Sequence, residues 1–193
     1  MHNKRISKRT DVTVEAEKAW YPIRVTYGRE MKFKFFLDSN RIANFLPMHY
    51  RECMIDGILQ RKLVPVIHNL VFVFASRKEL DDIKIQINGS IPIRYIMDRS
   101  TGQPMIIADK QMQSFIAVAG SPDEQVIYLD SVQANLKKGD RVRVTDGIWK
   151  GTEGVLVRIK RNKRVLVYIQ GIVAVATTYI HPSLLEIINE DNE

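Results

Sequence analysis

Hydrophobic and polar positions follow different patterns in the two parts of the chain, and the change falls near residue 120. Ahead of it, apolar runs rich in aromatic and β-branched residues predict strands. Pro22 lacks a backbone N–H, which places its strand at an edge or a bulge. The predicted strands are residues 19–27, 43–51, 63–75 and 91–97.

Two segments among these runs show helical spacing. Ser76 and Glu79 form a capping-box pair, in which each side chain accepts a hydrogen bond from the backbone of the other residue. Asp109 is expected to cap the later helix. The apolar positions at helical spacing are Leu80, Ile83 and Ile87 in the first segment, and Met112, Phe115, Ile116 and Ala119 in the second.

Residues 29–40 allow two interpretations. Alternating apolar positions from Met31 to Leu37 favour a strand. As a helix, the same residues place Met31 and Phe35 on one side and Phe33 and Leu37 on nearly the opposite side, with Phe36 between them. One sheet cannot cover so wide an apolar surface, so the spare apolar face would meet a partner. With the helix, the element order is β-α-β-β-α-β-α, which describes a ferredoxin-like α+β sandwich with an added helix.

Beyond the polar segment 120–124 the pattern changes to short strands separated by turn residues. Five such strands in about fifty residues predict a small closed β-barrel, because closure removes exposed edges. Residues 126–129 are a stray strand candidate in the linker. The barrel strands are residues 141–145, 155–160, 164–169, 172–178 and 184–188, with turns at Asp146-Gly147, Arg161-Asn162-Lys163 and Gln170-Gly171.

Composition places the chain among ordinary globular proteins, with 193 residues, 45% of them apolar and 26% charged. Cys53 is the only cysteine, which excludes an internal disulfide and a cysteine-based zinc site. The basic N-terminal residues are not followed by the apolar core of a signal peptide. No apolar run is long enough to span a membrane. We therefore expect a soluble cytoplasmic protein.

The formal net charge of +7 is unevenly distributed. Residues 137–164 hold ten Lys or Arg and three acidic side chains, whereas residues 165–193 hold no Lys or Arg and four acidic ones. A basic block of this density attracts polyanions, because neutralised phosphates release their counterions. The alternative is an ordinary solvated strand face.

One motif stands out in the second part, where residues 138–157 read KGDRVRVTDGIWKGTEGVLV. Val142 and Val144 are expected to point inward, with their arginine neighbours pointing outward. The three glycines that follow imply turns with positive φ or close backbone approach at a barrel corner. They are Gly147, Gly151 and Gly154. This frame resembles a KOW motif, the signature of small SH3-like barrels in transcription elongation factors and some ribosomal proteins.

The first part of the chain resembles the N-terminal (NGN) domain of NusG-type proteins, through Trp20-Tyr21, the element order, and Pro104 ahead of the last helix. The resemblance covers roughly residues 19–188 and is closer to specialised paralogues such as RfaH and the UpxY antiterminators. One departure is that residues 63–70 keep only the proline of the family's aromatic-Pro-Gly-Tyr segment. The implied domains are a flexible basic tail (1–18), an NGN-like domain (19–119), a linker (120–136), a KOW SH3-like barrel (137–188) and an acidic tail (189–193).

This resemblance implies a transcription elongation or antitermination factor that binds the clamp helices of the largest RNA polymerase subunit and suppresses pausing or termination at specific operons. The alternative for any candidate contact residue is a place in the core. The candidate polymerase contacts are Tyr27, Phe33, Phe36, Leu63, Val64 and Pro65, with Arg24 and Arg29 near the rim.

The barrel would then hold a second partner, such as nascent RNA, DNA or a ribosomal protein. Basic strands favour phosphate contacts, and an aromatic side chain could stack on bases. The candidate residues are Arg141, Arg143, Trp149, Lys150, Arg158, Lys160, Arg161, Lys163, Arg164 and Tyr168.

Catalytic chemistry has little support in the sequence. The four histidines are scattered without metal-ligand spacing, and no nucleophile has a neighbouring base. We therefore expect a monomeric protein without enzymatic activity, cofactor, metal or membrane partner. The alternative function is a KOW-type ribosome-associated RNA-binding protein.

Overall fold

The computed structural model describes residues 17–121, 125–130 and 139–188. Most of the predicted basic tail, part of the predicted linker and the predicted acidic tail lie outside the described residues.

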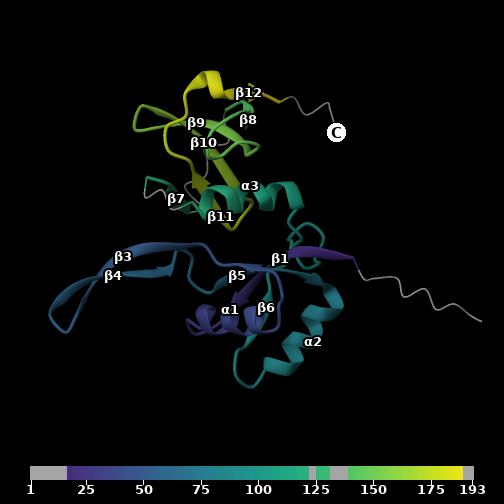
Figure 1. The fold of residues 1–193 in the computed structure, drawn as a ribbon. Coiled ribbons are helices and arrows are strands. Elements are labelled where there is room, and N and C mark those ends of the chain that lie inside the picture. Colours follow the sequence, from purple (N-terminus) through teal and green to yellow (C-terminus); the bar gives the residue numbers. More distant parts are fainter. Residues whose placement is uncertain (1–16, 122–124, 131–138, 189–193) are drawn as a thin grey trace, which may run out of the picture.

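A four-stranded sheet and three helices form the first domain. Its strands are β1 (Lys18–Val25), β2 (Asn44–Phe45), β5 (Leu70–Ser76) and β6 (Ile93–Tyr95). Its helices are α1 (Glu30–Ser39), α2 (Arg77–Ile87) and α3 (Asp109–Ala119). The strands are antiparallel in the order β2-β5-β1-β6, with α1 and α2 on one face and α3 on the other (Figure 1). The predicted α+β class is confirmed.

Strand β5 is buried on both sides because its alternate residues serve two cores. Val71 and Val73 join the cluster beneath α1 and α2, whereas Leu70 and Phe72 join the cluster that contains α3. This explains why the strand reads as a continuous apolar run in the sequence.

The helix ends show one confirmed prediction and one correction. At α2, Glu79 N–H donates to Ser76 Oγ and Ser76 N–H donates to Glu79 Oε2, which completes the predicted capping box. At α3, Asp109 does not cap the helix; the N-cap residue is Ala108, and no side chain makes the capping bond. Asp109 instead lies in the first turn, where its negative charge suits the helix dipole.

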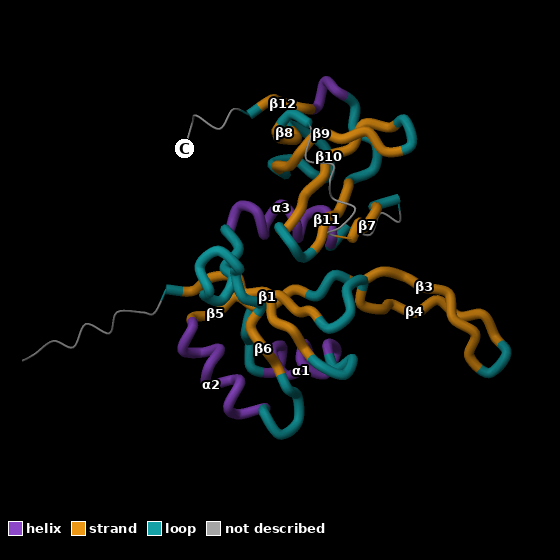
Figure 2. The backbone as a smooth tube through the Cα atoms, turned by 180° about the vertical axis from the view of Figure 1, so that it is seen from behind, coloured by secondary structure: helices purple, strands orange, loops and turns teal. Residues whose placement is uncertain are grey.

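Residues 48–65 form a long two-stranded ribbon that leaves the first domain and projects to one side (Figures 1 and 2). Its strands are β3 (Met48–Ile55) and β4 (Ile58–Pro65). Asp56 and Gly57 make the turn, with φ of 51° and 77°. Positive φ at both positions defines the tight turn that favours Asp-Gly. The predicted strands at 43–51 and 63–75 therefore each contain parts of two strands.

The second domain is a six-stranded sheet in the order β12-β8-β9-β10-β11-β7. Its strands are β7 (Ile127–Asp130), β8 (Arg141–Val144), β9 (Glu153–Ile159), β10 (Asn162–Ile169), β11 (Val173–Ala176) and β12 (Leu185–Ile187). The stray strand candidate at 126–129 is thus β7, which pairs with β11. A strand-rich domain of the SH3-like, KOW type is confirmed.

The glycines of the KOW motif serve the two purposes expected of them. Gly147 and Gly151 have φ of 85° and 86°, values that side chains with a Cβ rarely adopt. Gly154 has an ordinary φ, but a Cβ there would collide with the backbone oxygen of Leu166 on the neighbouring strand.

Helix α3 lies between the two domains and packs on both (Figure 1). Phe115 is fully buried and makes edge-on ring contacts with Phe45 and Phe72 of the first domain. The same apolar cluster continues into the second domain through Val167 and Val175. The described domains therefore share one continuous core at this helix.

Candidate functional site

The ribbon carries an apolar face that packs against little else. Cross-strand partners share a face, which places Tyr50 opposite Leu63 and Met54 opposite Leu59. We call these four residues the ribbon apolar face. Each is more than half exposed, between 52% and 66%. Between the two apolar pairs, the same face carries the opposed residues Glu52 and Arg61, and the Arg61 guanidinium carbon lies 4.7 Å from the Tyr50 ring. Exposed apolar side chains gathered among polar ones are typical of an interaction site.

A groove of about 480 Å³ opens at the foot of the ribbon. Tyr50 and Leu63 line it from the ribbon, and Phe45 lines it from β2. Its other wall includes Ala119 and Tyr128, whose hydroxyl donates to Ala119 O over 2.8 Å. Burial raises the pKa of Tyr128 to about 12, so its phenol stays protonated as a donor at neutral pH.

Of the candidate polymerase contacts, Leu63, Val64 and Pro65 lie together on β4 at this groove end of the ribbon. Leu63 is exposed, and the other two are half-buried. These three residues are consecutive in the sequence, and Pro65 is the proline that residues 63–70 keep from the family's segment. Four exposed apolar residues of the ribbon were missed: Tyr50, Met54, Ile58 and Leu59.

A second group of candidates lies at the turn between β1 and α1. Tyr27 is 81% exposed, has a φ of 62°, and its ring lies 5.4 Å from the Arg29 guanidinium carbon. Arg29 also donates to Ser90 O over 3.0 Å. The buried carboxylate of Glu30 accepts the Asn69 backbone N–H and fixes this turn to the start of β5. Arg24 is exposed on β1, opposite Arg94.

Phe33 and Phe36 do not form the spare face that the sequence led us to expect. Residues 30–39 are a helix, and Phe33 is 0% exposed within the core beneath the sheet. Phe36 is half-buried against the same cluster. The exposed apolar residues of α1 are Met31 and Phe35 instead. Phe33 is therefore a core residue and cannot contact a partner while the domain is folded.

Three of the barrel candidates are engaged within the protein. Trp149 is 6% exposed, so its indole cannot stack on a base. Arg164 is 7% exposed and donates to the carbonyl oxygens of Gln125 and Thr177 over 2.9 and 2.6 Å. Arg143 forms an ion pair with Glu153 over 2.7 Å, which raises the pKa of the guanidinium further. The burial of Trp149 and Arg164 corrects their predicted roles in base stacking and phosphate contact, whereas Arg143 stays a prediction because its side chain is 41% exposed.

The remaining basic candidates are more accessible. Lys163 is half-buried, and the other basic candidates are exposed. The aromatic candidate Tyr168 is half-buried beside α3, where its backbone carbonyl oxygen accepts a hydrogen bond from the Gln111 side chain over 2.8 Å. The exposed basic residues are Arg141, Lys150, Arg158, Lys160 and Arg161.

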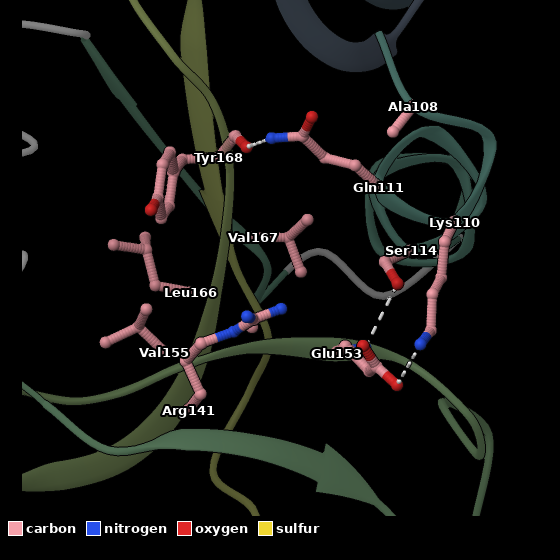
Figure 3. Close-up of a pocket in the computed structure, with 11 residues that line it drawn as sticks. Ala108, Lys110, Gln111, Ser114, Arg141, Glu153, Val155, Leu166, Val167 and Tyr168 are labelled. Atoms are coloured by element: carbon pink, nitrogen blue, oxygen red, sulfur yellow. Dashed lines mark hydrogen bonds and ion pairs between the residues drawn. The ribbon is translucent and has the colours of Figure 1, made fainter. Parts of the chain in front are cut away.

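A polar pocket of about 340 Å³ lies between α3 and the second domain (Figure 3). Ser114 Oγ accepts the Glu153 backbone N–H over 3.0 Å, and Lys110 Nζ lies 3.4 Å from the Glu153 carboxylate. These bonds tie α3 to β9 next to the shared core. The arrangement joins the two domains and presents no nucleophile with a base.

Within the described residues, no three His, Cys, Asp or Glu side chains are grouped as a metal site would require. No helix in the same part of the chain is long and apolar enough to cross a membrane.

The described fold and surfaces define a class: an α+β domain of the NGN type followed by a strand-rich domain of the KOW type. The family model described as "Transcription termination factor nusG" matches residues 18–116, just over half of the chain. The chain belongs to the NusG family, whose members are transcription elongation and termination factors that bind RNA polymerase.

Among solved structures, the chain is similar to one titled "Domain interaction in Thermotoga maritima NusG", with 23% identity and a TM-score of 0.42. The match covers 90% of this chain and 98% of that chain. No curated protein matches.

Proposed function

We propose that this chain binds the clamp helices of the largest RNA polymerase subunit through the ribbon apolar face and the groove at its foot, and that this binding suppresses pausing or termination. The observation that carries the proposal is the exposure of Tyr50, Met54, Leu59 and Leu63 on a ribbon that projects from the first domain. A two-stranded ribbon is marginally stable alone, so a partner that covers this face would also order it.

The groove supports the same surface. It continues the ribbon apolar face toward the shared core, and the Tyr128 hydroxyl, which donates to Ala119 O, can still accept a hydrogen bond beside apolar walls. Apolar walls with a few placed polar groups are the usual character of a binding site. A helix pair with apolar side chains along one side fits an elongated surface of this kind.

The mechanism we propose is mechanical. A factor that binds the productive state of polymerase better than the paused state shifts the equilibrium between them. A difference of about 1.4 kcal/mol in binding free energy changes that equilibrium tenfold. No chemical step on a substrate is needed, in keeping with the non-enzymatic character of NusG-family transcription factors.

The test compares polymerase binding by the full chain and by two single variants. Leu63→Glu places a charge on the ribbon apolar face, and we expect it to weaken binding at least tenfold. Ile85→Glu is the matched control, because Ile85 is an equally apolar, exposed residue on α2 outside the ribbon. Equal affinity of Leu63→Glu and the unchanged chain would refute the proposed surface.

A cellular test addresses antitermination at specific operons. Deletion of the gene should lower transcripts from the distal part of a few long operons and leave their promoter-proximal parts unchanged. A uniform change along all transcripts would contradict a specialised role. Co-sedimentation with ribosomal particles in place of polymerase would support the ribosome-associated alternative.

A further inference from the structure

Helix α1 presents a ridge of apolar side chains to solvent. Met31 and Phe35 are four positions apart in the helix, so their side chains lie next to each other on one face. Met31 is 50% exposed and Phe35 is 74% exposed. The buried residues Phe33 and Leu37 lie on the other side of the helix and hold this face outward. We call Met31 and Phe35 the α1 ridge; they form the spare apolar face that the sequence led us to expect.

The turn that leads into α1 carries a third exposed apolar side chain. Tyr27 is 81% exposed and has a φ of 62°, a value that bulky residues rarely adopt. Its turn is fixed in place, because the Gly28 N–H donates to Asn69 Oδ1 over 3.2 Å and the Val25 N–H donates to Asn69 O over 2.9 Å. An aromatic ring that is kept in water at a cost in backbone strain points to a binding role.

The α1 ridge stays in water within the described part of the chain. Helix α1 packs on β5, and with α2 it lies on the face of the sheet that is turned away from α3 and the second domain (Figures 1 and 2). The ribbon apolar face belongs to β3 and β4, which project to one side. A protein bound at the ridge therefore contacts a different surface from the one proposed for polymerase.

The free charges beside the ridge are positive. Lys32 follows Met31 on the helix, and Arg41 lies just past the helix end. Both are exposed, and neither forms an ion pair with another described residue. The exposed carboxylate of α1, Asp38, is already paired with Lys34 over 3.0 Å. Complementary charge on a partner is therefore negative.

The spacing of the ridge indicates the shape of the partner. Apolar side chains four residues apart form a ridge that fits the groove of a second helix, with the two axes crossing at about 50°. Aromatic residues and methionine are enriched at such interfaces. An apolar stripe on the second helix would cover the ridge, and acidic residues beside that stripe would face Lys32 and Arg41.

We propose that the α1 ridge, with Tyr27 at its start, binds an amphipathic helix of a protein other than RNA polymerase, and that Asp and Glu residues flank the apolar stripe of this helix. The chain would then hold polymerase through the ribbon and a second protein through α1. Because the two surfaces lie on different elements, either proposal can fail alone.

Photo-crosslinking in living cells identifies the partner. A photoreactive phenylalanine analogue at position 35 of the full chain keeps the aromatic character of the ridge. The same analogue at position 85 is the control, because Ile85 is an exposed apolar residue of α2. We expect crosslinks from position 35 to a helical segment with acidic residues beside an apolar stripe, and none to that segment from position 85.

A synthetic peptide of the crosslinked segment then measures the affinity by fluorescence anisotropy with the full chain. Phe35→Ala should weaken binding at least about tenfold, because aromatic residues at the centre of an interface carry much of its free energy. Ile85→Ala should leave the affinity unchanged. Both side chains are exposed, so Tm should stay within about 2 °C of the unchanged chain and unfolding cannot explain weaker binding.

Charge reversal tests the chemistry of the partner. Lys32→Glu should weaken binding about threefold or more at low salt, and the effect should shrink as salt screens the charges. Replacing the acidic residues of the peptide by lysine should restore binding to this variant. Undiminished affinity of Lys32→Glu would overturn the assignment to an acidic helix.

The remaining outcomes decide between possible occupants of the ridge. Crosslinks to an acidic helical segment, with a loss of affinity in Phe35→Ala and not in Ile85→Ala, support the proposal. Absence of crosslinks from position 35, or equal affinity of Phe35→Ala and the unchanged chain, overturns it. Crosslinks only to polymerase or to a second copy of this chain also overturn it. So does flotation with phosphatidylglycerol vesicles that Phe35→Ala abolishes, because the ridge would then contact lipid.

Discussion

Phe33 and Phe35 provide a direct test of how α1 is oriented. In a strand these two residues would share a face, whereas in the helix they lie about 200° apart. The structure places Phe33 at 0% exposure and Phe35 at 74%. Replacing each by alanine should therefore have very different consequences.

The expected magnitudes follow from this burial. Phe33→Ala removes a fully buried ring and leaves a cavity, which costs about 3–5 kcal/mol of the free energy of unfolding. In a chain of this size that corresponds to a fall in Tm of about 6–20 °C. Phe35→Ala removes a ring that is mostly in water and should stay within about 0.5 kcal/mol of the unchanged chain.

Urea unfolding followed by far-UV circular dichroism measures both values. Equal slopes against denaturant would show that only stability has changed, and not the surface exposed on unfolding. Similar destabilisation by both variants would refute the helical orientation of α1. A negligible effect of Phe33→Ala would restore Phe33 as a candidate contact.

Two further predictions concern the other elements. Gly154→Ala should destabilise the second domain by at least about 2 kcal/mol, because the added Cβ would collide with the backbone oxygen of Leu166. The control is Gly89→Ala, whose Cβ would meet no atom within 4 Å and which should leave stability unchanged. Calorimetry of both variants measures the difference. The Ser76 backbone N–H and Lys18 hold the pKa of Glu79 below 4.5, so its stabilisation is present above that pH and is lost as the pH falls through the folded pKa. The urea midpoint of the unchanged chain should therefore drop more between about pH 6 and pH 3 than that of Glu79→Gln, and equal drops would contradict the capping geometry.

Local signals in the sequence were enough to predict the fold class and several element boundaries. The Ser76–Glu79 pair predicts the start of α2 because capping depends on residues three positions apart. The glycines of the KOW motif predict corners because their constraint is in the backbone itself. Such features do not depend on distant packing.

The missed features depend on tertiary structure. Pro47 separates β2 from β3, and Asn69 with a φ of 62° precedes β5; the apolar runs at 43–51 and 63–75 divide there because the chain leaves the four-stranded sheet to form the ribbon. Arg164 belongs to a basic block that predicts exposure, but its strand position turns it toward buried carbonyl groups. The position of a residue across a sheet, and not its type, decides whether its charge is free.

Site-specific photo-crosslinking tests the central proposal most directly. A photoreactive residue at position 59 or 63 would report the surface that touches the ribbon apolar face in a transcribing complex. The proposal predicts crosslinks to the clamp helices of the largest polymerase subunit from both positions and none from position 85 on α2. Absence of polymerase crosslinks from both ribbon positions, in a complex that retains the chain, would contradict it.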